Sequence, residues 1–178
     1  PSAPPTSGVI EGKEVVILSR HGKAHTVPPT QVNFRANIHA LKTLGCSCIL
    51  ATTAVGSLRE EIGPGDLAIL DQFIDFTRRR SVSFYEAFEP HMPVHVSMAE
   101  PFSDELRSLL IDGCVELGYK HHPRATVVTI EGPRFSTRAE SNMFRTWGAD
   151  VINMSIAPEC ALANEAELPY AEIGRAHV

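Results

Sequence analysis

The sequence predicts an α/β layer fold with a largely parallel central sheet. Short aliphatic and β-branched runs alternate with segments of helical periodicity along most of the chain, which is the pattern of strand–helix–strand units. The 178 residues, 43% of them hydrophobic and 21% charged, are enough for one core of ordinary size. We therefore expect one domain and exclude a disordered chain or a disulfide-held mini-protein.

The strands are expected where apolar runs are bounded by turn residues. Residues 1–8 contain too much Pro and Ser for a regular element. The expected strands cover residues 14–19, 48–54, 67–74, 125–130 and 150–154, and a last strand opens at Pro169. A buried strand is expected at the first of these positions because EVVILS is a continuous aliphatic run.

The helices are expected between these strands. Apolar residues recur at three-residue steps from Asn33 to Gly45, which favours a helix. Ser103, followed by two acidic residues, is a fitting N-cap for a longer helix. Its expected apolar face consists of Leu106, Leu109, Leu110, Cys114 and Leu117. Thr137 and Glu140 have capping-box spacing, and residues 157–167 form the last predicted helix. Residues 76–98 are expected to be irregular, with the arginines at 78–80 as a solvated charge run.

Charge and cysteine content narrow the class of protein. The formal net charge is −5, which argues against nucleic acid or an anionic membrane as the main partner. The four cysteines lie in apolar contexts and are expected to be reduced core thiols. No run of 18 apolar residues is present. We expect a cytoplasmic protein, with the nucleus as a second location.

Candidate ligand-binding residues follow several of the predicted strands. In α/β sheets, ligands gather at the carboxyl ends of strands. The segments found there are RHG (20–22), TTAVGS (52–57), EGPRF (131–135) and NMS (153–155). Arginine, histidine, hydroxyl groups and glycine backbone are suitable donors for a tetrahedral anion. Phe135 and Met154 add apolar surface for an organic ligand.

Each segment alone also has a purely structural interpretation. Arg20 and His21 could lie in a solvated loop, the threonines at 52 and 53 suit any strand, and Phe135 and Met154 could be core residues. The repetition of such residues at successive strand ends favours a binding site.

Other common site patterns fail. His21 and His25 have the spacing of a zinc-binding pair, but no Glu follows His21 and Gly22 argues against a helix. Cys46 and Cys48 lack a second cysteine pair. The phosphate-binding loop, the dinucleotide fingerprint and the GxSxG elbow are absent from the sequence.

Several segments together carry a resemblance. They are SRHG with His25 and Thr26 (19–26), VNxRANI (32–38), TTAVGSL (52–58), GD (65–66), DQFID (71–75), MAEPF (98–102) and NMSxxPE (153–159). With these segments in register, the chain resembles the trimeric purine nucleoside phosphorylase family. The resemblance implies a phosphorylase/hydrolase-like three-layer fold with a mixed, mostly parallel central sheet flanked by helices, incomplete here.

The resemblance also implies a reaction. Members of this family cleave a purine nucleoside with inorganic phosphate as co-substrate, without a metal or another cofactor, and they act as homotrimers. The run TIEGPRFSTRAES (129–141) is similar to members that convert 5′-methylthioadenosine to adenine and 5-methylthioribose 1-phosphate. Ser155 and Ile156 depart from those members, and Val55 replaces a common Cys. An inosine/guanosine or methylthioinosine phosphorylase, or a non-catalytic module of the same fold, therefore remains an alternative.

The site residues implied by the resemblance fall into two groups. The phosphate-binding residues are Arg20, His21, Thr53, Ala54 and Ser155. The substrate-binding residues are Met154, Phe135, Val55, Gly56, Asn153 and His95. Among these, Met154 is expected to contact the ribose and Phe135 to stack on the base. His95 is expected to reach toward the 5′ substituent in a neighbouring subunit.

The boundaries suggest a piece of a longer protein. The first residue is Pro1, and no methionine precedes Met92. Residues 1–172 are interpreted as the central part of a single phosphorylase domain, and residues 173–178 as a non-native tail. The family's purine-contacting Asp, which supplies a proton to the leaving base, is expected beyond residue 172. No catalytic residue is therefore expected within the chain, and the chain alone is expected to be inactive.

Overall fold

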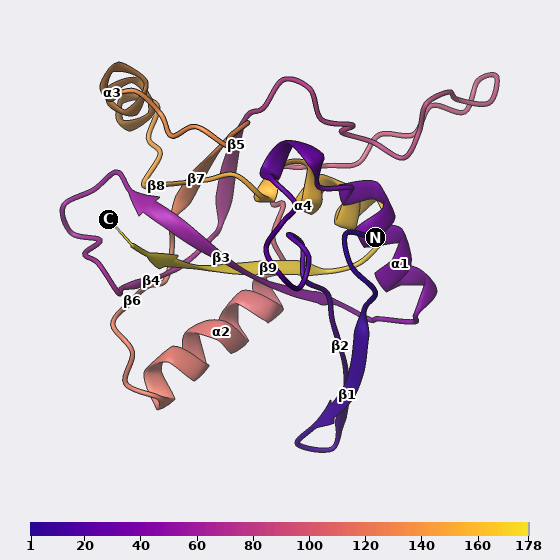
Figure 1. The fold of residues 1–178 in the computed structure, drawn as a ribbon, viewed down its shortest axis with the longest axis horizontal. Helices are drawn as coiled ribbons and strands as arrows, with labels where there is room; N and C mark the ends of the chain where they lie inside the picture. Colours follow the sequence, from indigo (N-terminus) through magenta and orange to yellow (C-terminus); the bar gives the residue numbers. More distant parts are fainter. Residues whose placement is uncertain (178) are drawn as a thin grey trace.

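A computed structural model describes residues 1–177 of the chain. Within them the main sheet has seven strands in the order β5-β7-β8-β3-β9-β4-β6, and Figure 1 shows β3 and β9 crossing the middle of the molecule. Four of the six neighbouring strand pairs are parallel, whereas β3–β8 and β4–β9 are antiparallel. The predicted α/β fold with a mixed, mostly parallel sheet is confirmed.

The strands of this sheet are β3 (Ile49–Ser57), β4 (Leu67–Ile69), β5 (Gln72–Phe76), β6 (His121–His122), β7 (Thr126–Ile130), β8 (Val151–Asn153) and β9 (Tyr170–Ala176). The helices are α1 (Phe34–Thr43), α2 (Asp104–Glu116), α3 (Arg138–Thr146) and α4 (Ile156–Glu165), with a 3-10 turn at Pro29–Gln31. The single strand predicted at residues 67–74 is two strands. Leu70 N–H donates to Glu172 O and Asp71 N–H to Ala125 O, so the chain changes partner between them.

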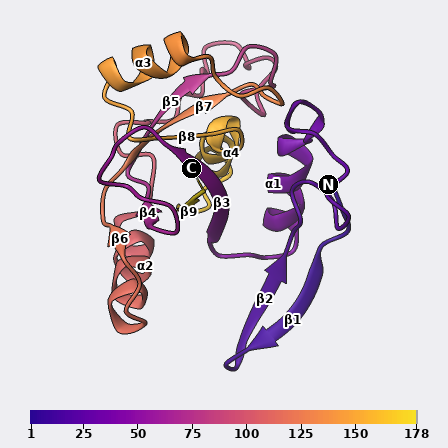
Figure 2. The same ribbon diagram turned by 60° about the vertical axis from the view of Figure 1, so that its left-hand side comes forward.

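The strand predicted at residues 14–19 exists, but the prediction that it is a buried strand is wrong. Residues 6–17 form a separate antiparallel hairpin of β1 (Thr6–Ile10) and β2 (Lys13–Ile17). Glu11 and Gly12 have φ of 49° and 76°, which closes the tight turn that such a hairpin needs. The hairpin projects from the body in Figures 1 and 2, and Val9 is 68% exposed. An aliphatic run therefore lies outside the main sheet.

The helix N-termini agree with the predicted caps. Asn33 accepts from Ala36 N–H, Ser103 from Leu106 N–H, and Thr137 and Glu140 form a full capping box. The apolar face of α2 is narrower than predicted, because Leu109 and Leu117 are 60% and 69% exposed. None of the helices among residues 1–177 is long and apolar enough to cross a membrane.

The helices cover the sheet from both sides. Figure 2 shows α1 and α2 on opposite sides of β3 and β9. Helix α2 packs on β4 and β9, and α4 packs on α1, β5 and β9. The first half of α4 is buried from Ile156 to Cys160. This burial fixes the N-terminus of α4 beside the end of β8 and the middle of β3.

Arg80, which was predicted to belong to a solvated charge run, has a buried side chain. The side chain of Arg80 is 4% exposed and pairs with Glu131 at 3.1 Å. It also donates to the carbonyl oxygens of Ala157, Ile130 and Glu131. The prediction of a solvated charge run is therefore wrong for Arg80, while Arg78 and Arg79 are exposed.

Residues 173–176 lie inside the sheet. They pair with Thr52–Val55 of β3 on one side and, from residue 173 to residue 175, with β4 on the other. An added Cβ at Gly174 would lie 2.7 Å from Val55 Cγ1, so the position accepts only glycine without a shift. These residues are part of the fold, and their non-native origin stays a proposal.

Candidate active site

A cavity of about 1110 Å³ opens where β3, β8 and the loop after β2 meet. Ten of the eleven predicted site residues line it: Arg20, His21, Thr53, Ala54, Val55, Gly56, Phe135, Asn153, Met154 and Ser155. His95 does not line it. Its ring lies 5.8 Å from that of Phe88, in the long segment between β5 and α2 that extends from the body in Figure 1.

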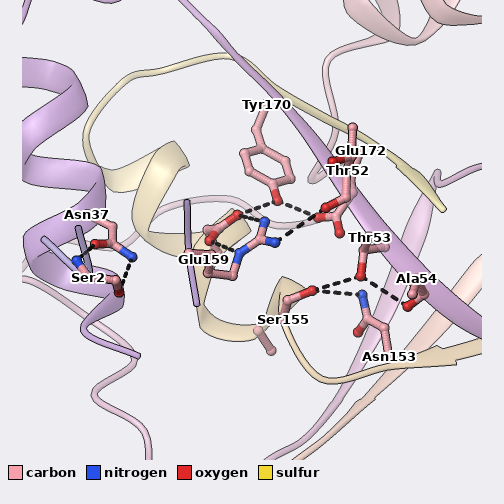
Figure 3. Close-up of polar contacts among 12 residues, drawn as sticks. Ser2, Asn37, Thr52, Thr53, Ala54, Asn153, Ser155, Glu159, Tyr170 and Glu172 are labelled. Carbon is pink, nitrogen blue, oxygen red and sulfur yellow. Dashed lines mark hydrogen bonds and ion pairs between the residues drawn. The ribbon is translucent and has the colours of Figure 1, made fainter. Parts of the chain in front are cut away.

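Two hydroxyl groups from distant parts of the chain meet in this cavity. Because β8 is antiparallel to β3, with Ile152 opposite Gly56, the chain leaving β8 runs back along β3. Thr53 Oγ1 and Ser155 Oγ therefore lie 3.1 Å apart, as Figure 3 shows. The two residues were predicted because they lie near the ends of predicted strands, but it is the antiparallel pairing of β3 and β8 that brings them together.

Buried amide and hydroxyl groups orient Ser155. Thr129 Oγ1 donates to Asn153 Oδ1 at 2.8 Å, and Asn153 Nδ2 donates to Ser155 Oγ at 3.4 Å. Thr129 is fully buried and Asn153 is 5% exposed. Since Ser155 Oγ accepts from Asn153, its own proton is free to point to Thr53 or to a ligand.

The backbone holds His21 at one of its two ring nitrogens. Its Nδ1 lies 2.8 Å from Val27 O, and a carbonyl oxygen only accepts, so Nδ1 carries a hydrogen. The Nε2 atom is left for a ligand, as an acceptor when the ring is neutral and as a donor when it is protonated. The His25 ring lies 4.8 Å away.

Arg20 forms a two-pronged ion pair with a residue that the sequence analysis did not select. Its Nε and Nη2 donate to Glu159 Oε2 and Oε1 at 2.7 and 2.6 Å, and Nη1 lies 3.4 Å from Thr52 O. The two side chains are 14% and 7% exposed. Burial opposes the charge of Arg20, but the Glu159 carboxylate outweighs it and raises the pKa of Arg20 above its usual value.

Tyr170 and Glu172 extend this pair into a chain of four groups (Figure 3). Tyr170 Oη donates to Glu159 Oε1 at 2.9 Å and also contacts Glu172 Oε2. The pKa of Glu172 is raised to about 7, because burial, together with the Glu159 carboxylate, opposes its charge more than Arg20 and the Tyr170 hydroxyl group favour it. Tyr170 has only one proton for the two carboxylates; when Glu172 is protonated it can donate to Tyr170 Oη, and the Tyr170 proton then goes to Glu159. Within the described residues, Glu172 Oε1 has no partner.

The cavity is also lined by apolar side chains. Val55, Ile152 and Met154 line it together with Phe135, whose side chain is exposed. Gly132 has φ of 69°, and an added Cβ would lie 2.5 Å from Met154 Sδ. Only glycine therefore lets the loop after β7 approach Met154 this closely.

The residues missed by sequence reasoning are Glu159 and Tyr170. Glu159 stood in the predicted helix as one acid among apolar neighbours, and such an acid must be paired when its helix face is buried. Within residues 1–177, no group of three or more His, Cys, Asp or Glu side chains could hold a metal ion, and all four cysteines are free thiols.

The family model of the phosphorylase superfamily matches residues 4–174. The chain belongs to the phosphorylase superfamily. Curated relatives agree: it is 52% identical to S-methyl-5′-thioadenosine phosphorylase of Xenopus tropicalis over 183 residues, which covers 99% of this chain and 65% of the relative. The same enzyme of Pyrococcus horikoshii is 54% identical over 173 residues, covering 97% of the chain and 66% of the relative. The chain thus spans about 65% of the length of these relatives.

Solved structures from the superfamily share the fold in detail. Methylthioadenosine phosphorylase of Schistosoma mansoni in complex with adenine superposes with a TM-score of 0.94 at 41% identity, covering 99% of this chain and 67% of that one. The complex of that enzyme with tubercidin gives the same score and identity. The resemblance found from the sequence motifs is confirmed.

Proposed function

We propose that the whole protein to which these residues belong cleaves 5′-methylthioadenosine with inorganic phosphate, giving adenine and 5-methylthioribose 1-phosphate. The observation that carries the proposal is the cavity itself. Its lining combines anion donors with apolar side chains that suit a purine nucleoside and its methylthio group. The relatives named S-methyl-5′-thioadenosine phosphorylase support this substrate.

Phosphate is bound by charge-assisted hydrogen bonds from several elements. Ser155 and Thr53 offer hydroxyl groups 3.1 Å apart, a spacing that suits two oxygens of one phosphate. His21 offers Nε2, and Arg20 offers the N–H groups that Glu159 leaves free. Such donors are fixed before the ligand arrives, which lowers the cost of binding and of charge rearrangement.

The reaction breaks one bond and forms one bond at the sugar. A phosphate oxygen attacks C1′, and the bond from C1′ to N9 of the purine breaks with its electron pair leaving on the base. The sugar passes through an oxocarbenium-like state, which the phosphate charge stabilises. The departing adenine needs a proton at N7. The donors at the phosphate end therefore position the nucleophile, and another group must supply that proton.

The group that protonates the base is not one of the residues described above. Among the described residues that line the cavity, none is Asp or Glu. We propose that an aspartate beyond these residues protonates the base, and that residues 1–178 alone bind phosphate but release adenine very slowly.

A homotrimer is the proposed assembly. The segment between β5 and α2 carries exposed apolar side chains, among them Phe88 and Met92, and His95 lies in it. A neighbouring subunit would cover this surface and bring His95 to the 5′ end of a second cavity.

The substrate test compares nucleosides on the full-length enzyme. We expect kcat/KM for 5′-methylthioadenosine to exceed that for inosine and methylthioinosine by at least about a hundredfold, because a site that hydrogen-bonds a 6-amino group rejects a 6-oxo group. A preference for 6-oxo purines would instead support the alternative suggested by Ser155.

A further inference from the structure

We infer that Glu159 is the positioning residue that gives Arg20 its phosphate-binding orientation. This inference rests on the proposed phosphate site and deepens it. Glu159 touches the guanidinium group rather than the cavity: the residues that line the cavity include Arg20 but not Glu159. It would therefore act on phosphate only through Arg20.

Arg20 needs an external anchor because no regular element holds it. It lies in the loop between β2 and the turn at Pro29–Gln31, and β2 belongs to the hairpin outside the main sheet. A long side chain on such a loop has many rotamers, and fixing one of them costs free energy. An anchor on a rigid element reduces what phosphate itself must fix.

Glu159 is such an anchor. It lies in the first turn of α4, where the helix dipole favours a negative charge. Its Oε1 also accepts from Tyr170 Oη at 2.9 Å, and Tyr170 is 1% exposed at the start of β9. A buried helix and a buried strand therefore fix the carboxylate from two sides.

The contact leaves a defined set of donors for phosphate. A guanidinium group has five N–H bonds. Glu159 takes one on Nε and one on Nη2, and Nη1 turns one toward Thr52 O. The edge formed by Nη1 and the second Nη2 hydrogen is left for the cavity. The side-on pair thus decides which edge of Arg20 the phosphate meets.

A role in charge balance alone predicts the opposite effect. Glu159 cancels the charge of Arg20, so its removal would make the site more positive and tighten phosphate binding. If Glu159 acts by orientation, its removal weakens phosphate binding although the site becomes more positive. The sign of the change separates the two roles.

The experiment measures inorganic phosphate binding to the full-length protein by calorimetry, with the KM values for phosphate and nucleoside alongside. For Glu159→Gln and Glu159→Asp we expect about tenfold weaker phosphate binding and a nucleoside KM within about twofold of the parent value. Glu159→Asp keeps the charge but shortens the side chain, so it tests geometry. The matched control is Glu165→Gln on the same helix, whose carboxylate binds Ser83 and Phe84; it should leave phosphate binding unchanged.

Two further variants keep the test decisive if the Glu159 variants fold poorly. Tyr170→Phe removes one fixing contact and should weaken phosphate binding about threefold. Lysine has no planar guanidinium group that Glu159 could orient. In an Arg20→Lys background, Glu159→Gln should therefore have no additional effect on phosphate binding. Unchanged or tighter phosphate binding in Glu159→Gln, or no change in Tyr170→Phe, would overturn the inference. Calorimetry needs no turnover, so Glu159-dependent phosphate binding without adenine release would refute the proposed function alone.

Discussion

Thr53 Oγ1 and Ser155 Oγ lie 3.1 Å apart although 102 residues separate them in the chain. The pair forms because β8 is antiparallel to β3 and directs the chain back along it. Ser155 is 4% exposed, and its hydroxyl group accepts from Asn153 Nδ2. The two hydroxyl groups are therefore held side by side at the cavity, where we propose that phosphate binds.

Removing either hydroxyl group should weaken the binding of phosphate but not that of the nucleoside. For Ser155→Ala and Thr53→Val we expect the phosphate KM of the full-length enzyme to rise about tenfold, the loss of one hydrogen bond to a charged group. Ser155→Thr keeps the hydroxyl and should stay within about threefold of the parent. The exposed Ser108 on α2 provides the control Ser108→Ala. An equal rise in the nucleoside KM would argue against a phosphate contact.

Gly132→Ala should disturb the cavity beside Met154, where we propose that the nucleoside binds. The new Cβ would meet Met154 Sδ at 2.5 Å, and the backbone has φ of 69°. We expect a stability loss of about 1–3 kcal/mol from backbone strain and a higher nucleoside KM with a nearly unchanged phosphate KM. Gly113→Ala in α2, where a Cβ meets nothing within 4 Å, serves as control in the same kinetic and urea-unfolding assays. A phosphate KM that rises as much as the nucleoside KM would contradict this assignment.

Arg80→Ala should destabilise the chain, whereas Arg79→Ala should not. Arg80 pairs with Glu131 and donates to three carbonyl oxygens, all of which would lose a buried partner. The expected loss is about 3 kcal/mol in the free energy of unfolding, measured by urea denaturation. A change within about 0.5 kcal/mol, the usual range for an exposed residue, would mean that Arg80 is solvated after all.

The stability of the 178-residue chain should fall as pH rises from about 4.5 to 7. The folded pKa of Glu172 is about 7 against an ordinary 4.5, so in this interval the folded chain binds more protons than the unfolded chain. Stability from the protonated group is complete below pH 4.5 and is lost as pH passes 7. Glu172→Gln removes the titration and should be more stable than the parent by about 2 kcal/mol at pH 8, with little difference at pH 5.

Urea unfolding at the two pH values measures this difference. Glu60→Gln, at an exposed position, should leave the pH dependence unchanged. An equal stability of Glu172→Gln and the parent at pH 8 would show that Glu172 is not held protonated by its surroundings.

Local signals predicted the parts of the fold that local interactions decide. The N-caps at Ser103 and Thr137 act within one turn of their own helix, so sequence spacing was enough to find them. The split between β4 and β5 was not visible, because it depends on which partner strand is nearest. The hairpin of β1 and β2 was missed for the same reason: an aliphatic run does not reveal whether the main sheet has a place for it.

In the candidate site too, local sequence predicted some residues, whereas contacts that depend on tertiary packing were missed. Residue types at strand ends pointed to Arg20, Thr53 and Ser155, and the motif resemblance added their expected roles. The pairing of Arg20 with Glu159 depends on the packing of α4 against the sheet. No spacing rule connects two residues 139 positions apart, so this contact follows only from the tertiary fold.

The decisive measurement is the phosphate dependence of adenine release from 5′-methylthioadenosine by the full-length protein. We expect adenine release only when phosphate is present, with 5-methylthioribose 1-phosphate formed in equal amount, and a large loss of this activity in Arg20→Ala. Adenine release at the same rate without phosphate, with free methylthioribose as the second product, would show a hydrolase and would refute the proposed phosphorolysis.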